Sequence, residues 1–388
     1  MSILQIGEII RDTYEVEKFL GQGAFAEVYR VSHQFMRQRQ AMKVFKTPGT
    51  TLSDLEMGMG EARMLSELRH PNLMEVFDAN VMEIQGRRYG YFTMNYMPGG
   101  TLETYWRSFG NRFMPVEEVV DVARQLCRGL SLAHSKTPAI VHRDIKPQNI
   151  LVSYPETGIH VRLSDFGLAK AVNPLTLLAS SRGTIGFKPP ESFRNQDSCP
   201  ADIWALGTTL YLLLTDNLPF PALGNRDLED AHRFLRPLIP ASSFNSAVDR
   251  ALDTILFRCL ASDPLDRYPH AMELLNDLDR WSPGADPLGS CLSDYGKTCT
   301  PAPTPAATRE ADAARLAEQA FEVAKDPTRL AEAAELMEEA IGKNPEFRDK
   351  YREHLRLWRR GVMHVAIGAF PERTKNRETP RNERGLPQ

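Results

Sequence analysis

Three side chains within one short segment have the types and spacing that phosphoryl transfer requires. The segment 141–151 has the sequence VHRDIKPQNIL, which places Asp144, Lys146 and Asn149 at fixed offsets within an apolar run. Asp144 can take a proton from a hydroxyl group. Lys146 can neutralise a phosphoryl group during its transfer, and Asn149 can hold a divalent metal ion. The segment therefore predicts a site for phosphoryl transfer.

A glycine-rich turn near the start of the chain is a second candidate for binding phosphate. Residues 20–28 have the sequence LGQGAFAEV, and the absence of side chains at Gly21 and Gly23 would let backbone N–H groups approach a phosphate closely. An ordinary β-hairpin explains the same residues, so both interpretations stay open at this point.

Lys43 lies inside the apolar run 41–45, which predicts a short β-strand. A lysine in such a strand is costly unless it meets an anion. Glu61, on the apolar face of a helix predicted over 52–68, could supply that anion and leave Lys43 facing a phosphate. Alternatively, Lys43 lies on an edge strand and Glu61 faces solvent.

A further candidate metal ligand, Asp165, begins the sequence Asp165-Phe166-Gly167 after a strand predicted over 161–163. An aspartate at a strand end can bind Mg²⁺ that bridges phosphate oxygens. Asp-x-Gly is also a common turn sequence. Its position shortly after Asp144 is what favours the metal site.

Two charged residues in apolar surroundings predict a structural contact. Glu191 ends the segment GTIGFKPPE at 183–191, and Arg267 belongs to the segment DPLDRY at 263–268. A buried ion pair between them is the economical explanation.

Composition excludes several classes of protein. The chain has 388 residues, of which 42% are hydrophobic and 25% charged, as in ordinary globular proteins. The net charge of −3 gives no electrostatic support for nucleic-acid binding. Five scattered cysteines indicate reduced thiols. We find no signal-peptide pattern and no apolar run long enough to span a membrane, and therefore expect a cytoplasmic protein.

Periodicity predicts a strand-rich first part and a helical second part of the main domain. Strands are expected over 14–20, 26–31, 41–45, 72–80 and 89–96. The sequence Pro98-Gly99-Gly100 then breaks the pattern and marks a boundary. Helices are expected over 116–135, 202–214, 247–260 and 270–281.

The C-terminal part changes character. Residues 283–308 are rich in proline and predict an extended linker. Residues 309–367 predict a helical module, either a tetratricopeptide-like unit or a generic helical packing module. Residues 368–388 predict a disordered tail. From Lys343 onward basic residues outnumber acidic ones, which indicates either a solvated helix face or a docking surface for the acidic body of the protein or for an acidic partner.

Taken in order, these motifs resemble those of the protein kinase family over about residues 14–281. The combination of Lys146 with the Gly-Thr at 183–184 looks like the serine/threonine branch, because tyrosine kinases usually carry alanine or arginine at the lysine position. The segment HRDIKPQNIL is similar to that of bacterial Hanks-type kinases.

The resemblance implies an α+β, two-lobed protein-kinase-like fold with a small β-rich N-lobe and a larger helical C-lobe. An all-α C-terminal module would follow it. The implied divisions are an N-terminal extension at 1–13, a catalytic domain at 14–282 with lobes at about 14–97 and 98–282, and then the linker, module and tail described above.

The resemblance also assigns roles to individual residues. Asp144 would orient and deprotonate the substrate hydroxyl, while Lys146 would stabilise the transferring phosphoryl group. Asn149 and Asp165 would hold Mg²⁺, with Mn²⁺ as an alternative ion. Asp202 would brace the catalytic loop. The residues implied to bind ATP are Leu20, Gly21, Gly23, Val28, Ala41, Lys43, Glu61, Met94, Asn95, Met97 and Leu151.

The departures from the family pattern are few. Ala26 stands where a third glycine is usual, and Pro189 stands where alanine is usual. Neither would touch phosphate or metal directly, so they do not argue against catalysis.

An activation loop is implied over residues 168–183. In the family, an arginine at the position of Arg143 often meets a phosphate on this loop. We therefore expect autophosphorylation there, at Ser180 or Ser181 rather than Thr176, although these are ordinary loop hydroxyls in the alternative view. Thr184 would face the acceptor residue.

The sequence therefore predicts an ATP-dependent and Mg²⁺-dependent serine/threonine protein kinase that acts on protein substrates. Its C-terminal helical module is expected to offer a surface to a protein partner. The alternative is a catalytically silent nucleotide-binding scaffold that acts through those C-terminal helices. A small-molecule kinase on the same fold is a third interpretation.

Overall fold

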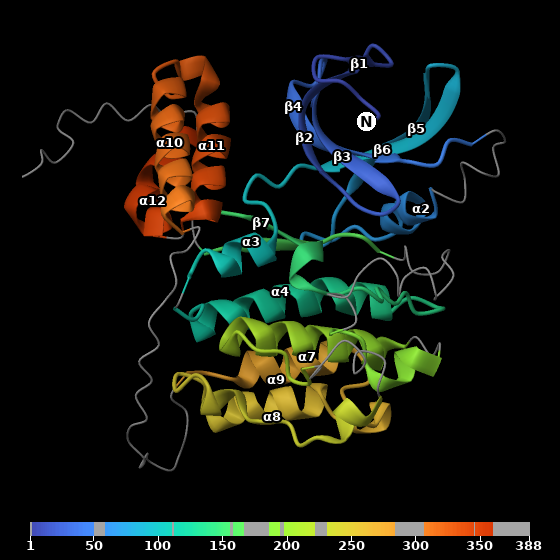
Figure 1. The fold of residues 1–388 in the computed structure, drawn as a ribbon, viewed down its shortest axis with the longest axis vertical. Coiled ribbons are helices and arrows are strands. Elements are labelled where there is room, and N and C mark those ends of the chain that lie inside the picture. The colour runs from blue at the N-terminus through green and yellow to red at the C-terminus, as the bar shows by residue number, and fades with distance from the viewer. Residues whose placement is uncertain are drawn as a thin grey trace, which may run out of the picture.

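The protein has a sheet-rich N-lobe stacked on a helical C-lobe, with three C-terminal helices beside the N-lobe (Figure 1). The computed structural model describes residues 2–49, 59–110, 112–155, 158–166, 186–194, 198–221, 231–283, 306–344 and 346–359.

The described part of the N-lobe is built on one antiparallel sheet of six strands in the order β1-β2-β3-β4-β6-β5. Alternation along the strands gives the sheet two apolar faces. One face carries Val16, Tyr29 and Met42 in one buried cluster, whereas Ala41 and Met94 belong to a cluster on the other face. The strands are β1 Ile9–Ile10, β2 Tyr14–Gln22, β3 Ala26–His33, β4 Gln38–Phe45, β5 Val76–Ile84 and β6 Arg87–Asn95.

The strand predicted over 72–80 was placed too early in the chain, since β5 begins at Val76. The preceding residues bind the C-lobe instead. The amide of Asn72 donates to Gln125 and to the carbonyl of Val161, each at 3.0 Å, and Leu73 forms an isolated bridge with Leu163. These contacts hold Asn72 and Leu73 at the junction of the lobes, outside the sheet.

The first residues of the chain also join the sheet. β1 pairs with β2, and Leu4 is buried. The backbone N–H of Ile3 donates to Glu27 at 2.8 Å, and that of Leu4 donates to the Tyr29 hydroxyl at 3.1 Å. The segment before Tyr14 is therefore part of the N-lobe structure.

The C-lobe is organised around two long helices, α4 and α7. α7 is apolar on all sides and buried, as the sequence predicted. Gly207 lets α7 approach α8 closely, because a Cβ atom there would lie 2.6 Å from the Cβ of Cys259. The described helices and strands of the C-lobe are α3 Leu102–Arg107, α4 Val116–His134, β7 Ile150–Ser153, β8 His160–Leu163, α7 Cys199–Thr215, α8 Arg250–Cys259 and α9 Ala271–Arg280. The N-lobe also has a helix, α2 Gly60–Ser66.

Three further helices follow, and each packs against the next in the chain: α10 Ala306–Val323, α11 Leu330–Lys343 and α12 Glu346–Arg359. The apolar stripe predicted along α11 is buried, and it belongs to the same apolar cluster as the C-lobe core. Among the helices in the part of the chain that the structure describes, none combines the length and the apolar character needed to cross a lipid bilayer.

Candidate active site

Lys43 binds one carboxylate from each lobe. It lies on β4, in register with Val28 on β3 and Phe92 on β6. Its Nζ atom donates to Oε2 of Glu61 on α2 at 2.8 Å, and also to Oδ1 of Asp165. The ion pair expected from the sequence is thus present, and a third charged group joins it.

This cluster has one cation and two carboxylates, and burial makes that imbalance matter. Lys43 and Glu61 are almost inaccessible, with side chains 5% and 2% exposed. Burial raises the pKa of Glu61 to about 7, although Lys43 counteracts it. Burial would also raise the pKa of Asp165, but Lys43 outweighs this and lowers it. Lys43 therefore outweighs burial at Asp165 but not at Glu61, and Asp165 keeps its negative charge.

The candidate base Asp144 is held by two neighbours in its own segment. Lys146 Nζ donates to Oδ2 of Asp144 at 2.7 Å, and the side-chain amide of Asn149 donates to the same oxygen at 2.9 Å. Pro147–Asn149 form a short 3₁₀ turn, which brings the amide back over Asp144. The three residues singled out from the sequence therefore form one contact group.

Asn149 and Asp165 also approach each other through the backbone. The N–H and the hydroxyl of Ser164 donate to the carbonyl of Asn149 at 2.9 and 3.0 Å. The Asn149 amide directs its nitrogen at Asp144, so its oxygen is the atom suited to a cation. An amide oxygen and a charged carboxylate are the donors that Mg²⁺ takes in proteins, so these residues fit the expected metal site.

Asp202 fixes the backbone of the catalytic segment. Its carboxylate accepts the N–H groups of His142 at 2.7 Å and Arg143 at 2.8 Å, and it lies 3.1 Å from Nε2 of His134. Arg143 has a left-handed backbone conformation with φ 74°. Such a conformation needs support from its surroundings, and the carboxylate of a buried core helix supplies it, as the sequence predicted.

The apolar residues expected to enclose an adenine ring lie together on one face of the N-lobe sheet. Ala41 and Met94 are partners across β4 and β6, and both are buried. Val28 from β3 and Leu151 from β7 are partly exposed and pack against the same cluster. The two lobes thus contribute facing parts of one apolar surface.

The segment that joins the lobes follows Met94. The backbone N–H of Asn95 donates to the carbonyl of Glu75 at 3.3 Å, and its side-chain oxygen accepts the N–H of Glu75 at 2.8 Å. Met97 is buried, and its carbonyl accepts the N–H of Gly100 at 3.3 Å. We call residues 94–100 the hinge.

The glycine-rich turn is open where a phosphate would lie. A Cβ atom at Gly21 or Gly23 would meet no described atom within 4 Å, and neither residue has a positive φ. Neither crowding nor backbone conformation therefore requires glycine at these positions. Leu20, near the end of β2, is exposed. Lys46 holds the turn by donating to the carbonyl of Gly23 at 2.8 Å.

The predicted regulatory residues are only partly described. Lys188 donates to the carbonyl of Arg143 at 2.6 Å, which ties residues 186–194 to the catalytic segment. Thr176, Ser180, Ser181 and Thr184 lie outside the described residues. Their predicted roles therefore stay predictions.

The buried pair predicted between Glu191 and Arg267 is present. The guanidinium binds both carboxylate oxygens, at 2.6 and 2.9 Å. Glu191 and Arg267 both belong to the C-lobe, whereas Lys43 and Glu61 belong to the N-lobe. The contact is structural, as expected.

Sequence reasoning missed several supporting groups. His142 donates through Nε2 to the carbonyl of Ser164 at 2.8 Å, and its Nδ1 accepts the N–H of Asp144 at 3.2 Å. Its ring packs edge-on against Phe166 at 4.5 Å. Burial lowers the pKa of His142, which suits this neutral, donor-acceptor role. Its place beside Arg143 and Asp144 was the available signal.

Comparisons with known proteins agree with this geometry. The family model for the protein kinase domain matches residues 14–278. The chain is 31% identical over 283 residues to a probable serine/threonine-protein kinase PknB of Lactococcus lactis, a match that covers 71% of this chain and 43% of the relative. It is 30% identical over 298 residues to the serine/threonine-protein kinase PknB of Mycobacterium tuberculosis, covering 74% and 46% respectively.

Among solved structures, the kinase domain of Mycobacterium tuberculosis PknI is similar, with a TM-score of 0.52 and 25% identity. That match covers 71% of this chain and 98% of the other. The chain spans less than half the length of the two PknB relatives. Its fold, its charged cluster and the extent of the family match together establish that the chain belongs to the protein kinase family.

Proposed function

We propose that the protein is a serine/threonine protein kinase that transfers the γ-phosphoryl group of ATP to hydroxyl groups of proteins. One observation carries the proposal: Asp144, Lys146 and Asn149 form one contact group, and Asp165 connects this region to Lys43 and Glu61. A base, phosphate-binding cations and metal ligands thereby meet between the lobes.

The residues divide the work by position. Lys43, held by Glu61 on α2, binds the phosphates of ATP that lie under the glycine-rich turn. Asp144 orients the acceptor hydroxyl and accepts its proton. Lys146, already 2.7 Å from Asp144, faces the same space and offsets negative charge on the phosphoryl group.

A divalent ion, when bound, neutralises phosphate charge and fixes the phosphate oxygens in position. Asn149 and Asp165 are the residues that would hold it, and Mn²⁺ could replace Mg²⁺ there because both accept oxygen ligands. Asp165 retains its negative charge because Lys43 lowers its pKa. The N–H and the hydroxyl of Ser164 both donate to the carbonyl of Asn149, and these bonds hold the residue before Asp165 against Asn149.

Lys146 and the relatives support serine and threonine as the acceptor residues. The two PknB relatives are described as serine/threonine-protein kinases, and Lys146 stands at the position that distinguishes that branch. We also propose autophosphorylation at Ser180 or Ser181, with Arg143 as the residue that meets the phosphate. A triple alanine variant at positions 176, 180 and 181 that kept full activity would contradict this part.

The test is incubation of the full chain with γ-labelled ATP and Mg²⁺, with a basic generic protein as acceptor. We expect label on serine and threonine, and a loss of roughly 10³-fold in Asp144→Asn, because that change removes the base without adding bulk. Equilibrium binding of an ATP analogue should be nearly unchanged in this variant.

The competing function is a nucleotide-binding scaffold that acts through the C-terminal helices. It predicts that the wild-type chain binds ATP but transfers no label to itself or to the acceptor protein. That result, obtained with folded protein and Mg²⁺ or Mn²⁺ present, would overturn the kinase proposal.

A further inference from the structure

One face of α11 carries acidic residues that contact the basic side of the N-lobe. Glu339 accepts hydrogen bonds from Lys18 on β2 at 3.3 Å, Arg30 on β3 at 3.4 Å and the Tyr96 hydroxyl in the hinge at 3.0 Å. About one turn earlier on the same helix face, Glu335 pairs with Arg39 on β4. The helix therefore binds three neighbouring strands and the hinge.

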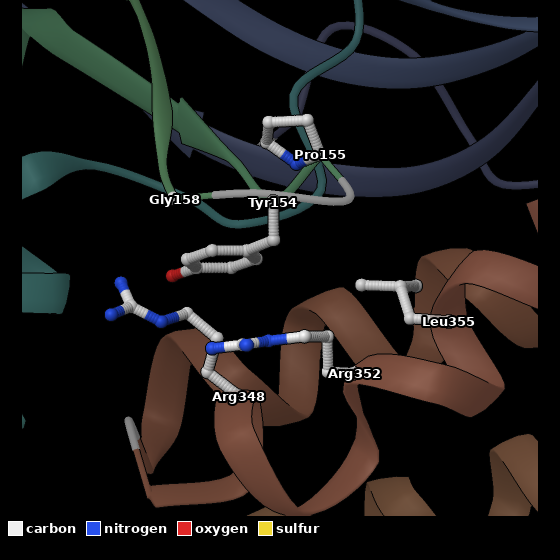
Figure 2. A pocket seen from close by; sticks show the side chains of 6 residues that line it. All are labelled: Tyr154, Pro155, Gly158, Arg348, Arg352 and Leu355. Atoms are coloured by element: carbon white, nitrogen blue, oxygen red, sulfur yellow. The ribbon is translucent and has the colours of Figure 1, made fainter.

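The same helices also bind the C-lobe. Glu338 is buried and accepts the backbone N–H of Tyr154, just after β7, at 3.2 Å. Arg348 on α12 donates to Glu118 on α4 at 2.8 Å and to the Tyr105 hydroxyl at 3.1 Å. Figure 2 shows the Tyr154 ring lying over the side chain of Arg348. The C-terminal helices are thus attached to both lobes.

Between these two sets of contacts, α11 touches the hinge backbone directly. A Cβ atom on Gly342 would lie 2.7 Å from the carbonyl oxygen of Gly99 and 3.5 Å from the Tyr154 hydroxyl. Contact at this distance is closer than a methyl group allows, so the approach depends on glycine. The helix rests on the hinge without a side chain between them.

Tyr96 is the residue through which this contact can reach the nucleotide. It lies between Asn95 and Met97, two hinge residues that the family resemblance implies in ATP binding. The guanidinium of Arg30 lies over its ring at 5.6 Å, and Glu339 binds its hydroxyl. Burial, together with the charge of Glu339, raises the pKa of the Tyr96 hydroxyl, which stays a neutral donor.

We propose that α11 is part of the nucleotide-binding machinery, in which Glu339 and Gly342 position the hinge and thereby set the separation of the lobes. The proposal rests on the kinase function only for the identity of the nucleotide. Any rotation of the N-lobe against the C-lobe must break one of the two sets of contacts, because α11 binds the N-lobe while α11 and the adjoining α12 bind the C-lobe. The docked helix therefore favours one arrangement of the two lobes. Nucleotide binds more tightly because this arrangement is already formed before binding.

The experiment compares full-length variants that loosen the contact at different points. Glu339→Gln removes the charge, Tyr96→Phe removes only one hydroxyl, and Gly342→Ala adds one methyl group. Glu322→Gln is the control, because Glu322 on α10 makes an exposed ion pair with Lys325. For each chain, one measures the Kd of a non-hydrolysable ATP analogue, the KM for ATP, kcat and the thermal unfolding midpoint.

We expect Glu339→Gln and Gly342→Ala to raise the nucleotide Kd and the KM about 5-fold to 10-fold, within the usual range of coupling between sites, while kcat changes less than about 2-fold. Tyr96→Phe should raise the nucleotide Kd and the KM by less. The double variant Tyr96→Phe with Glu339→Gln should have the same Kd as Glu339→Gln alone, because both changes break the same contact. Glu322→Gln should match the wild type.

Gly342→Ala distinguishes positioning from simple stabilisation. Alanine favours a helix over glycine, so a helix that merely stabilised the fold elsewhere would gain from this change. A wild-type nucleotide Kd in both Gly342→Ala and Glu339→Gln, whatever happens to the unfolding midpoint, would overturn the proposal. The Kd is measured without turnover, so this result can be told apart from failure of the proposed kinase function. In that case, neither the wild type nor any variant would transfer a phosphoryl group. Should either variant fail to fold, Tyr96→Phe, which keeps the ring, decides the question alone.

Discussion

Two ion clusters in this chain are built from similar residues but differ in charge balance; both are buried except for Asp165, whose side chain is 34% exposed. Glu191 and Arg267 form one cation with one carboxylate, and their side chains are 8% and 0% exposed. Each N–H group of the guanidinium has an acceptor, since the carbonyls of Ala261, Pro200 and Ser262 complete the set. In the cleft, Lys43 faces both Glu61 and Asp165.

The difference separates a structural contact from a functional one. The Glu191–Arg267 pair is neutral and its donors are satisfied, so no further ligand is needed. The cleft cluster has a formal charge of −1, from one lysine and two carboxylates, in a place where burial penalises charge. An incoming cation can remove that penalty, so the imbalance favours binding of a metal with the nucleotide phosphates.

The largest effect that would test this comparison is expected for Asp165→Asn. The change removes the surplus charge and a metal ligand, so phosphoryl transfer should fall by at least roughly 10³-fold, equivalent to about 4 kcal/mol. The free energy of unfolding should stay the same or increase, because Lys43 and Glu61 then form a balanced pair. Label transfer and urea denaturation measure the two quantities.

A loss of stability parallel to the loss of activity in Asp165→Asn would break the comparison, since it would make Asp165 a structural partner like Glu191. Asp144→Asn is the matched control, because it lies in the same site but outside the Lys43 cluster.

A smaller effect, on stability alone, is expected for Glu191→Gln. The change leaves the Arg267 charge buried without a carboxylate, which costs about 3 kcal/mol or more. The KM for ATP, measured well below the unfolding midpoint, should not change. Replacing both residues with apolar side chains of similar volume should recover part of the lost stability, and a double variant less stable than Glu191→Gln would contradict this interpretation.

The smallest effect concerns pH. The pKa of Glu61 is about 7 in the folded protein against 4.5 ordinarily, so the folded state binds the proton more tightly. The resulting stabilisation is fully present below about pH 4.5 and is lost as pH rises through 7. Relative to Glu61→Gln, the wild type should lose on the order of 2 kcal/mol across this window, as followed by urea denaturation. A difference of opposite sign would show that Lys43 outweighs burial.

Much of the site could be predicted from the sequence because a charged residue in an apolar run needs a partner. The pairs Lys43–Glu61 and Glu191–Arg267 follow from that rule, whereas the contact of Asp202 with the catalytic backbone was implied only by the resemblance to kinases. The third member of the Lys43 cluster did not, since the sequence assigned Asp165 to metal alone. Nothing in the sequence around Asp165 reveals that it binds the same lysine as Glu61.

The docking of α11 could not be predicted for a related reason. The excess of basic residues from Lys343 onward indicated either a solvated helix face or docking through cations, and Arg348 does bind Glu118. The contacts of α11 with the N-lobe have the opposite sign, since Glu335 and Glu339 supply the carboxylates. Their partners lie about 300 positions earlier in the chain, and a charged helix face has the same pattern whether it meets solvent or another lobe.

The close approach of Gly342 to Gly99 has a consequence for how this protein can vary. A bulky residue at position 342 conflicts with the hinge, and a Cβ at position 99 would lie 2.5 Å from the carbonyl of Val152. Neither lobe nor module can change its surface there independently. The hinge and the C-terminal helices therefore constrain each other's sequence at this contact, and a helical module taken from another kinase would not fit this hinge unless it offered a glycine at the same turn.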